Sequence, residues 1–214
     1  MSKVAVIPAY NESASLKAVI ESITQYFDHI VVIDDCSTDN TPSIALDSGC
    51  IVCSNIRNLG YDQSVLIGLN IAIKFSPSIV ITLDADGQHP AVSIPAIIKH
   101  AFSQNCDMLL CSRNEFPRLS ETISSHLSRI IYNCPDLFTG MKCYCRRSLE
   151  LIPSSCSWDS VGTYYAFLSL NRNFNVDSYS ITCTSRAGSS RFGSSIRSEL
   201  RILKAFFFGF TRAV

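Results

Sequence analysis

The sequence predicts an α/β domain in which a mainly parallel sheet carries helices on both faces. Three observations lead to this fold class. Short apolar runs alternate with segments of helical periodicity through the first half of the chain. These runs are apolar at almost every position, which is typical of strands buried on both faces. The chain has 214 residues, of which 47% are hydrophobic and 17% charged, so it can build a sizeable core.

The first half of the chain reads as strand and helix in turn. Residues 4–8 form a short apolar run that predicts the first strand. Leu16, Val19, Ile20 and Ile23 then recur at the spacing of one helix face. The same reasoning predicts strands at residues 30–33, 51–53, 78–83 and 107–111, and helices that begin at Pro42 and span residues 62–75 and 92–102.

The second half is less regular. Residues 119–132 have the pattern of an amphipathic helix, whose apolar side is formed by Ile123, Leu127, Ile130 and Ile131. After it, the pattern predicts a strand at residues 141–145, a helix at 159–170 and an extended segment at 174–184.

The end of the chain, residues 196–214, mixes phenylalanine with arginine and lysine. This composition favours an amphipathic segment at a membrane surface. We therefore expect one domain over residues 1–195, followed by this membrane-proximal segment. No apolar run reaches the roughly 18 residues of a membrane span, and the opening MSKVAVIPAYNE lacks the apolar core of a signal peptide.

The cysteines indicate a reducing compartment. There are ten of them and no secretory signal, so we expect free thiols in a cytoplasmic protein. Cys50 and Cys53 have C-x-x-C spacing, but the two residues between them read as strand. No second pair at zinc spacing follows, and the four histidines stand apart, so we expect no structural zinc site.

Charge is distributed unevenly although the formal net charge is zero. Residues 1–110 contain 5 Lys and Arg against 11 Asp and Glu, whereas residues 111–214 contain 13 against 7. The acidic half suits a metal ion, and the basic half suits phosphates or an anionic membrane surface.

Three polar clusters follow predicted strands: PAYNE at residues 8–12, Asp34 with Asp35, and Asp84 with Asp86. Ligands of open parallel sheets bind outside the carboxyl ends of the strands. The three clusters are therefore expected to converge on one crevice.

Asp84 and Asp86 lie one residue apart where a buried strand runs into a turn. Two such carboxylates can share Mg²⁺ or Mn²⁺, which prefer oxygen ligands and bridge to phosphates. The chain contains neither G-x-x-x-x-G-K-[ST] nor G-x-G-x-x-G after a strand. This disfavours a P-loop and a common dinucleotide fold, so metal and arginines must neutralise any bound diphosphate.

Four ordered stretches carry a family resemblance: VAVIPAYNE, IVVIDDCSTDNT, RNLGYDQSVLIGLNIA and VITLDADGQHP. It continues through Cys111-Ser112-Arg113, PDLFTGMKCYCRRSLELI and SRAGSSRF, and covers residues 3–195. The chain resembles the family-2 glycosyltransferases, and within them the branch of dolichyl-phosphate mannose and glucose synthases and their bacterial polyprenyl-phosphate relatives. The resemblance implies a GT-A fold and an inverting transfer from a UDP- or GDP-sugar.

The same resemblance implies the residues that would form the site. Those that would line the nucleotide pocket are Pro8, Ala9, Tyr10, Glu12, Asp34 and Asp35. The metal, Mg²⁺ or Mn²⁺, would be held by Asp84, Asp86 and Gln88. The residues that would contact phosphates, sugar or acceptor are Arg113, Arg129, Asp136, Arg186, Ser190 and Arg191. Asp86, Arg113, Asp136 and Arg186 would act in catalysis.

The acceptor remains open between two chemistries. A polyprenyl phosphate is already anionic and needs positioning rather than a strong base, whereas a glycan hydroxyl needs a carboxylate to take its proton. Relatives often have an acidic residue where residues 161–165 have none, which favours the phosphate and a site at the cytoplasmic face of a membrane. Relatives also often have glycine where Asp62 stands, and its carboxylate would oppose a diphosphate unless it turned away.

Two other classes remain alternatives. A nucleotidyltransferase also uses acidic metal sites, but usually with a basic, glycine-rich N-terminal loop that PAYNESASL lacks. A non-catalytic protein that kept the fold is disfavoured by the presence of both aspartates. We expect no nucleic-acid partner.

Overall fold

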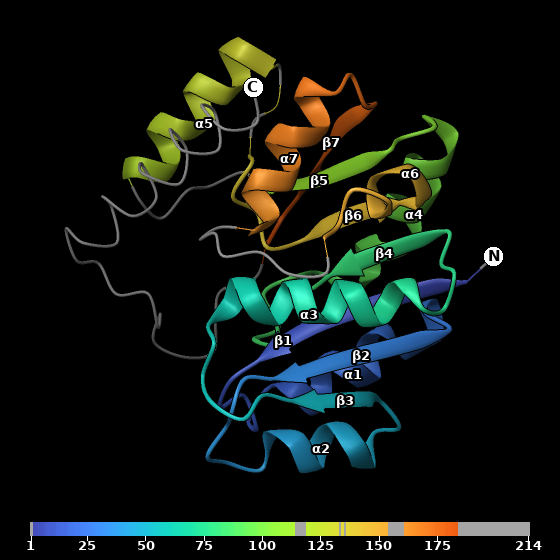
Figure 1. Ribbon diagram of the computed structural model, residues 1–214, viewed down its shortest axis with the longest axis vertical. Helices are drawn as coiled ribbons and strands as arrows, with labels where there is room; N and C mark the ends of the chain where they lie inside the picture. The colour runs from blue at the N-terminus through green and yellow to red at the C-terminus, as the bar shows by residue number, and fades with distance from the viewer. Residues whose placement is uncertain (1, 114–118, 133, 135, 154–160, 184–214) are drawn as a thin grey trace.

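The computed structural model describes residues 2–113, 119–132, 134, 136–153 and 161–183. At its centre is a seven-stranded sheet in the order β3-β2-β1-β4-β6-β5-β7 (Figure 1). The strands are β1 (Lys3–Ala9), β2 (His29–Asp34), β3 (Ile51–Ser54), β4 (Ile79–Thr82), β5 (Met108–Arg113), β6 (Lys142–Cys145) and β7 (Val176–Ile181). The predicted strands are therefore confirmed, to within a few residues at their ends.

Helices cover both faces of the sheet, as the sequence predicted (Figure 1). One face packs against α1 (Leu16–Ile23), α2 (Thr41–Asp47) and α4 (Ile94–Ser103). The other packs against α3 (Tyr61–Ile73) and α7 (Val161–Asn171). The remaining elements are α5 (Leu119–Tyr132), the short α6 (Arg146–Leu149) and the 3₁₀ turns η1 (Thr24–Tyr26) and η2 (Ala91–Ser93).

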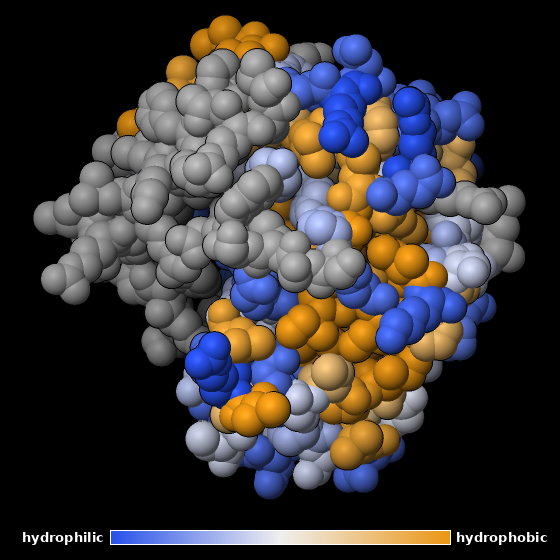
Figure 2. Space-filling model, in the orientation of Figure 1, coloured by the Kyte–Doolittle hydropathy of each residue, from blue (hydrophilic) through white to orange (hydrophobic). Residues whose placement is uncertain are grey.

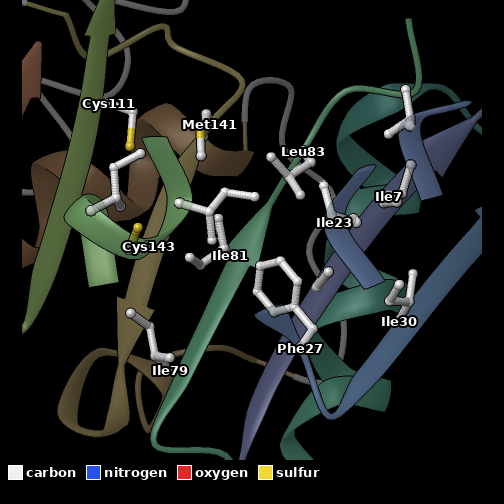
Figure 3. Close-up of a cluster of buried hydrophobic side chains, with 14 of the residues drawn as sticks. Ile7, Ile23, Phe27, Ile30, Ile79, Ile81, Leu83, Cys111, Met141 and Cys143 are labelled. Atoms are coloured by element: carbon white, nitrogen blue, oxygen red, sulfur yellow. The ribbon is translucent and has the colours of Figure 1, made fainter. Parts of the chain in front are cut away.

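Alternation along the strands divides the core into two clusters. Ala5 and Ile7 of β1 belong to the cluster beneath α1 and α4, part of which is drawn in Figure 3. Val4 and Val6 belong to the opposite cluster, beneath α3 and α7. Successive strand side chains point to opposite faces, and both faces are covered, so residues 4–9 of β1 are all apolar.

The direction of β6 is the feature that the strand pattern did not specify. All other pairings are parallel, but β6 runs antiparallel between β4 and β5. Its pairing of Ile81 with Cys143 brings the segment before β6 to the carboxyl end of β4. There the Thr82 hydroxyl donates to the Gly140 carbonyl at 2.8 Å. The reversal therefore adds residues 136–142 to the edge where the parallel strands end.

Helix α5 lies where the sequence predicted it, but of the four residues of its predicted apolar side only Leu127 packs against the core. Ile123, Ile130 and Ile131 are 43%, 81% and 48% exposed. The buried side chains of this helix are instead Ser120, Glu121, Ser124, Ser125 and Ser128. Small serines allow close packing, and the Ser128 hydroxyl donates to the carbonyl of Cys134 at 2.7 Å. Figure 2 shows hydrophobic atoms along the outer edge of α5.

Candidate active site

The polar clusters meet at the carboxyl edge of the sheet. The loops after β1, β2, β4 and β5 leave from this edge, because these four strands run in one direction. The segment that leads into β6 reaches the same edge from the other direction. The convergence predicted from the strand-end clusters is therefore present.

The loops after β1 and β2 are tied together by hydrogen bonds. The backbone N–H of Asn11 donates to the Ser37 hydroxyl at 2.9 Å, and the backbone N–H of Thr38 donates to the Asn11 side-chain oxygen at 2.7 Å. The backbone N–H of Glu12 donates to the Thr41 hydroxyl at 2.8 Å. Asn11 has a φ of 51°, a left-handed conformation uncommon outside functional turns and glycine. The pocket expected around Tyr10 and Glu12 thus has a rigid wall.

Asp39 completes this wall. Its carboxylate accepts the backbone N–H groups of Ser13 and Thr41 at 3.1 and 3.0 Å, and the Thr41 hydroxyl. Burial raises the pKa of Asp39, but the hydrogen bonds from Thr41 and Ser13 outweigh it and lower the pKa to about 2. Asp39 is therefore ionised at neutral pH and holds the two loops together.

Asp34 and Asp35 are both buried at the end of β2. The Asp35 carboxylate accepts the backbone N–H groups of Leu59 and Gly60, each at 2.8 Å, and the side-chain amide of Asn55 at 2.8 Å. Asp35 thereby fixes the loop that leads into α3. Asp34 accepts the backbone N–H of Ser37 at 3.2 Å. Both aspartates thus support the loops around the expected nucleotide pocket.

Asp84 is held from three sides. The Tyr61 hydroxyl donates to Asp84 Oδ1 at 3.0 Å, and His89 Nε2 lies 3.6 Å from Asp84 Oδ2. The backbone N–H of Asp84 donates to His89 Nδ1 at 3.1 Å. The carboxylate also lies against Gly140, where an added Cβ would stand 2.4 Å from Asp84 Oδ2. His89 thus supports Asp84 from within the same turn.

Asp86 and Gln88 follow in the same turn. The backbone N–H of Gln88 donates to Asp86 Oδ1 at 3.1 Å, and Gly87 between them has a φ of 78°. The half-buried carboxylates of Asp84 and Asp86, with the Gln88 amide, offer hard oxygen donors of the kind that Mg²⁺ and Mn²⁺ prefer. Within the described ranges, no group of three His, Cys, Asp or Glu residues could hold a metal. Two carboxylates and an amide are a donor set that suits Mg²⁺, which proteins usually hold by one or two carboxylates together with substrate phosphates.

Arg113, at the end of β5, is held by two acidic residues. Its Nε donates to Asp136 Oδ2 at 2.9 Å, and its Nη2 lies 3.3 Å from both Asp136 Oδ1 and Glu121 Oε2. The Asp136 side chain is 1% exposed and that of Glu121 is 6% exposed. Burial lowers the pKa of Arg113, but the charges of Asp136 and Glu121 outweigh it and raise the pKa above its ordinary value. Arg113 is thus a fixed cation.

Asp136 is buried, and its carboxylate is held by Arg113 and by the backbone. Besides Arg113, it accepts the backbone N–H of Phe138 at 3.1 Å. These bonds orient the guanidinium of Arg113. Contact of Asp136 with the sugar and acceptor, as the resemblance implies, stays a prediction.

Three further residues join the site without having been singled out as functional. Lys142, 4% exposed, donates from Nζ to the carbonyl of Thr139. Burial lowers the pKa of Lys142 to about 8, against the opposing charges of Asp136 and Asp84. The sequence feature that could have identified Lys142 is its position in the otherwise apolar stretch 141–145. Tyr61 and Asp62 stand within the quoted RNLGYDQS stretch, but no pattern pointed to their partners.

The Asp62 carboxylate is bonded to the start of α7. Its Oδ1 accepts the backbone N–H of Val161, the first residue of α7, at 2.7 Å. The carboxylate therefore stabilises the start of a helix, where negative charge is favourable. This explains how an acidic residue is accommodated where relatives often have glycine.

The other expected site residues have these positions. Pro8 and Ala9 are buried at the end of β1, and Tyr10 and Glu12 are half-buried in the loop that follows. Arg129 is exposed in the last turn of α5. Arg186, Ser190 and Arg191, like the C-terminal segment 196–214, lie outside the described residues.

Comparison with known proteins gives one family. The profile of the family described as Glycosyl transferase family 2 matches residues 4–152. A Methanococcus voltae UDP-N-acetylglucosamine–dolichyl-phosphate N-acetylglucosaminyltransferase is 28% identical over 131 residues, which cover 53% of this chain and 52% of that protein. A Serratia proteamaculans undecaprenyl-phosphate 4-deoxy-4-formamido-L-arabinose transferase is 36% identical over 109 residues, which cover 45% of this chain and 32% of that protein.

The match thus spans about half or less of the length of these relatives. Among solved structures, glucosyl-3-phosphoglycerate synthase from Mycobacterium tuberculosis, in complex with Mn²⁺, UDP and glucosyl-3-phosphoglycerate, superposes with a TM-score of 0.79. The two are 18% identical, and the superposition covers 98% of this chain and 80% of that one. This likeness confirms the predicted GT-A fold.

Proposed function

The chain belongs to glycosyl transferase family 2, and from this membership we propose that it transfers a sugar, with inversion, from a UDP- or GDP-sugar to a polyprenyl phosphate. The observation that carries the proposal is one edge of the sheet that holds two metal-type carboxylates, Asp84 and Asp86, and a fixed cation, Arg113. Departure of a nucleoside diphosphate develops negative charge, which a preorganised cationic site stabilises. The names of two relatives, one a dolichyl-phosphate and one an undecaprenyl-phosphate transferase, support this acceptor class.

We assign the metal to Asp84 and Asp86, with Gln88 as a third ligand. The solved neighbour contains Mn²⁺ and UDP, which supports a divalent ion, Mn²⁺ or Mg²⁺, in this chain as well. When bound, the ion supplies positive charge next to the donor diphosphate. Asp84 is prepared for this role, because Tyr61 and Gly140 already fix its carboxylate.

Arg113 is the proposed cation for donor or acceptor phosphate. Asp136 and Glu121 already orient its guanidinium, so little side-chain entropy is lost when a phosphate binds. Arginine suits this role because its charge persists at any physiological pH. Asp136 and Glu121 therefore act through Arg113.

The buried position of Asp136 bears on the choice of acceptor. A hydroxyl acceptor requires a carboxylate that can receive its proton, but the Asp136 carboxylate is bonded by Arg113 and the backbone of Phe138. A phosphate acceptor carries its negative charge already and needs only to be positioned. This observation supports the lipid phosphate over a glycan hydroxyl, which remains the second candidate.

A membrane-bound acceptor requires that the protein reach a membrane surface. In the part of the chain that the structure describes, no helix is long and apolar enough to span a bilayer. The outward-facing isoleucines of α5, Ile123, Ile130 and Ile131, are instead suited to peripheral contact, with Arg129 beside them for anionic headgroups. We place this contact at the cytoplasmic face.

The remaining assignments rest on position within the family motifs. Pro8, Ala9, Tyr10, Glu12, Asp34 and Asp35 are assigned to the nucleotide pocket. Arg129, Arg186, Ser190 and Arg191 are assigned to phosphate and acceptor binding. Residues 1–195 form the proposed catalytic domain, and residues 196–214 a second membrane-proximal segment.

A donor screen tests the proposal. The 214-residue chain is incubated with Mn²⁺ and a panel of UDP- and GDP-sugars, and released nucleoside diphosphate is measured. We expect turnover or binding of at least one donor and loss of both in Asp86→Ala. Absence of binding and turnover for every donor would overturn the transferase assignment. Formation of pyrophosphate from a nucleoside triphosphate and a sugar phosphate would instead indicate a nucleotidyltransferase.

A further inference from the structure

Three consecutive residues at the start of α3 each contact a different part of the site. The backbone N–H of Gly60 donates to Asp35 at the end of β2, at 2.8 Å. The Tyr61 hydroxyl donates to Asp84 after β4, at 3.0 Å. Asp62 accepts the backbone N–H of Val161 at the start of α7. The start of α3 therefore joins the expected nucleotide pocket, the metal carboxylate and the start of α7, which covers the same face of the sheet as α3.

The contact of Tyr61 is the one that bears on chemistry. Asp84 is half-buried, and its carboxylate lies against Gly140, so it can turn only within a narrow space. Tyr61 binds Oδ1, while Oδ2 lies on the side of His89. A phenol is protonated at neutral pH, since its ordinary pKa is about 10, so it acts here as a donor. The hydroxyl therefore selects one orientation of the carboxylate.

We propose that Tyr61 is a positioning residue of the metal site, whose hydroxyl fixes the orientation of Asp84 for ion binding. The inference rests on the proposed function, because it takes Asp84 to be a metal ligand. Groups that hydrogen-bond to a metal ligand fix its direction, and their removal typically weakens metal affinity by about 10- to 100-fold.

The support beneath Tyr61 is itself rigid. Gly60 has a φ of 87°, a conformation that favours glycine, and its N–H is held by Asp35. The Asp35 carboxylate also accepts the N–H of Leu59 at 2.8 Å. Tyr61 is thus the first helical residue after a loop that the expected nucleotide pocket fixes in place, so the pocket and the metal carboxylate share one support.

Tyr61→Phe is the direct test, because it removes one oxygen. The ring is 38% exposed, so the change should not leave a cavity in the core. Tyr132→Phe is a matched control, because the Tyr132 hydroxyl also donates to a side-chain oxygen, that of Asn171, at 3.2 Å. Free Mn²⁺ is titrated by electron paramagnetic resonance in the presence of saturating UDP or GDP, whichever the wild type binds more tightly. Thermal unfolding without metal verifies the fold of each variant.

We expect Tyr61→Phe to raise the Mn²⁺ dissociation constant by about 10-fold or more, with wild-type unfolding, while Tyr132→Phe leaves the constant unchanged. Unchanged affinity in Tyr61→Phe would overturn the inference. So would tighter binding, which would show that the hydroxyl competes with the ion, and equal weakening in both variants. If the wild type itself fails to bind Mn²⁺ with either nucleotide, the proposed function fails, and the inference fails with it.

Discussion

The guanidinium of Arg113 and the carboxylate of Asp136 form a buried ion pair with Nε and Oδ2 2.9 Å apart. The two residues come from different segments, β5 and the loop before β6, and meet because β6 is inserted antiparallel beside β5. This pair fixes the cation on which the proposed phosphate binding depends.

Asp136→Asn should be strongly destabilising. The substitution keeps the shape but removes the charge that compensates Arg113, and breaking a buried pair by removing one partner costs about 3–5 kcal/mol. The free energy of unfolding, measured in urea, is the readout, and donor turnover should fall in parallel. Asp177→Asn is the control, because the Asp177 side chain is 42% exposed where it pairs with His100. An equal loss of stability in both variants would show that the buried pair has no special role.

Gly140→Ala should displace Asp84. A Cβ at this position would stand 2.4 Å from Asp84 Oδ2, so the carboxylate must move. Mn²⁺-dependent nucleotide binding should weaken by about 10-fold or more. Gly162→Ala is the comparison, because its Cβ would meet Lys142 at 3.4 Å, an ordinary contact. Wild-type Mn²⁺ affinity in Gly140→Ala would contradict the assignment of Asp84 as a ligand.

The exposed isoleucines of α5 predict membrane contact. Ile130→Asp replaces an 81% exposed apolar side chain with a charge, so binding to vesicles that contain anionic lipid should fall. Co-sedimentation with such vesicles measures the bound fraction. Leu46→Asp on α2 is the control, since Leu46 is also exposed, at 61%, but lies on another helix. Equal binding by wild type and Ile130→Asp would remove α5 from the proposed membrane surface.

Stability should decrease in alkaline solution. Burial raises the pKa of Cys134 and Cys145 from 9.0 to about 12, and burial, followed by the charge of Asp177, raises that of Cys106 to about 11. Above pH 9.0 the unfolded chain releases these protons while the folded chain keeps them, so their stabilisation is lost as the pH rises toward 12. Lys142 acts in the opposite direction, because burial lowers its pKa from 10.5 to about 8 and its contribution to stability rises with pH between these values. The three thiols together outweigh this one lysine above pH 9.0.

Urea unfolding in the presence of a reducing agent measures this effect. The urea midpoint should fall between about pH 9 and pH 11. Cys134→Ala should reduce the dependence on pH, whereas Cys36→Ala, in a half-exposed turn, should not. A urea midpoint that rises over this pH interval would contradict the raised pKa values of the buried thiols.

Periodicity located the strands and helices because burial on both faces makes the central strands β1, β2 and β4 largely apolar. It could not locate β6 within the sheet, since four residues, Lys142–Cys145, carry no mark of their direction or neighbours. It also located α5, but of the predicted apolar side only Leu127 packs against the core. The buried residues of α5 are serines and Glu121, which pairs with Arg113, and helical periodicity contains no record of such a partner.

The residues of the site likewise divide into those that local sequence could identify and those that it could not. The strand-end aspartates were identified because their position follows from local sequence and the direction of parallel strands. The bond between Tyr61 and Asp84 joins residues separated by 23 positions, and that between Asp62 and Val161 joins residues separated by 99. No local pattern encodes these distances. Lys142 differs, because a charged residue in an apolar strand was visible and its burial could have been anticipated.

The proposed reaction of this chain is the transfer of a sugar to a polyprenyl phosphate. The direct measurement is mass spectrometry of lipid after incubation of the 214-residue chain with Mn²⁺, the donor selected by the screen and a short polyprenyl phosphate. We expect a new lipid whose mass is increased by one sugar residue, in wild type but not in Asp86→Ala. Donor turnover that leaves the lipid phosphate unmodified, while a glycan hydroxyl is glycosylated, would contradict it.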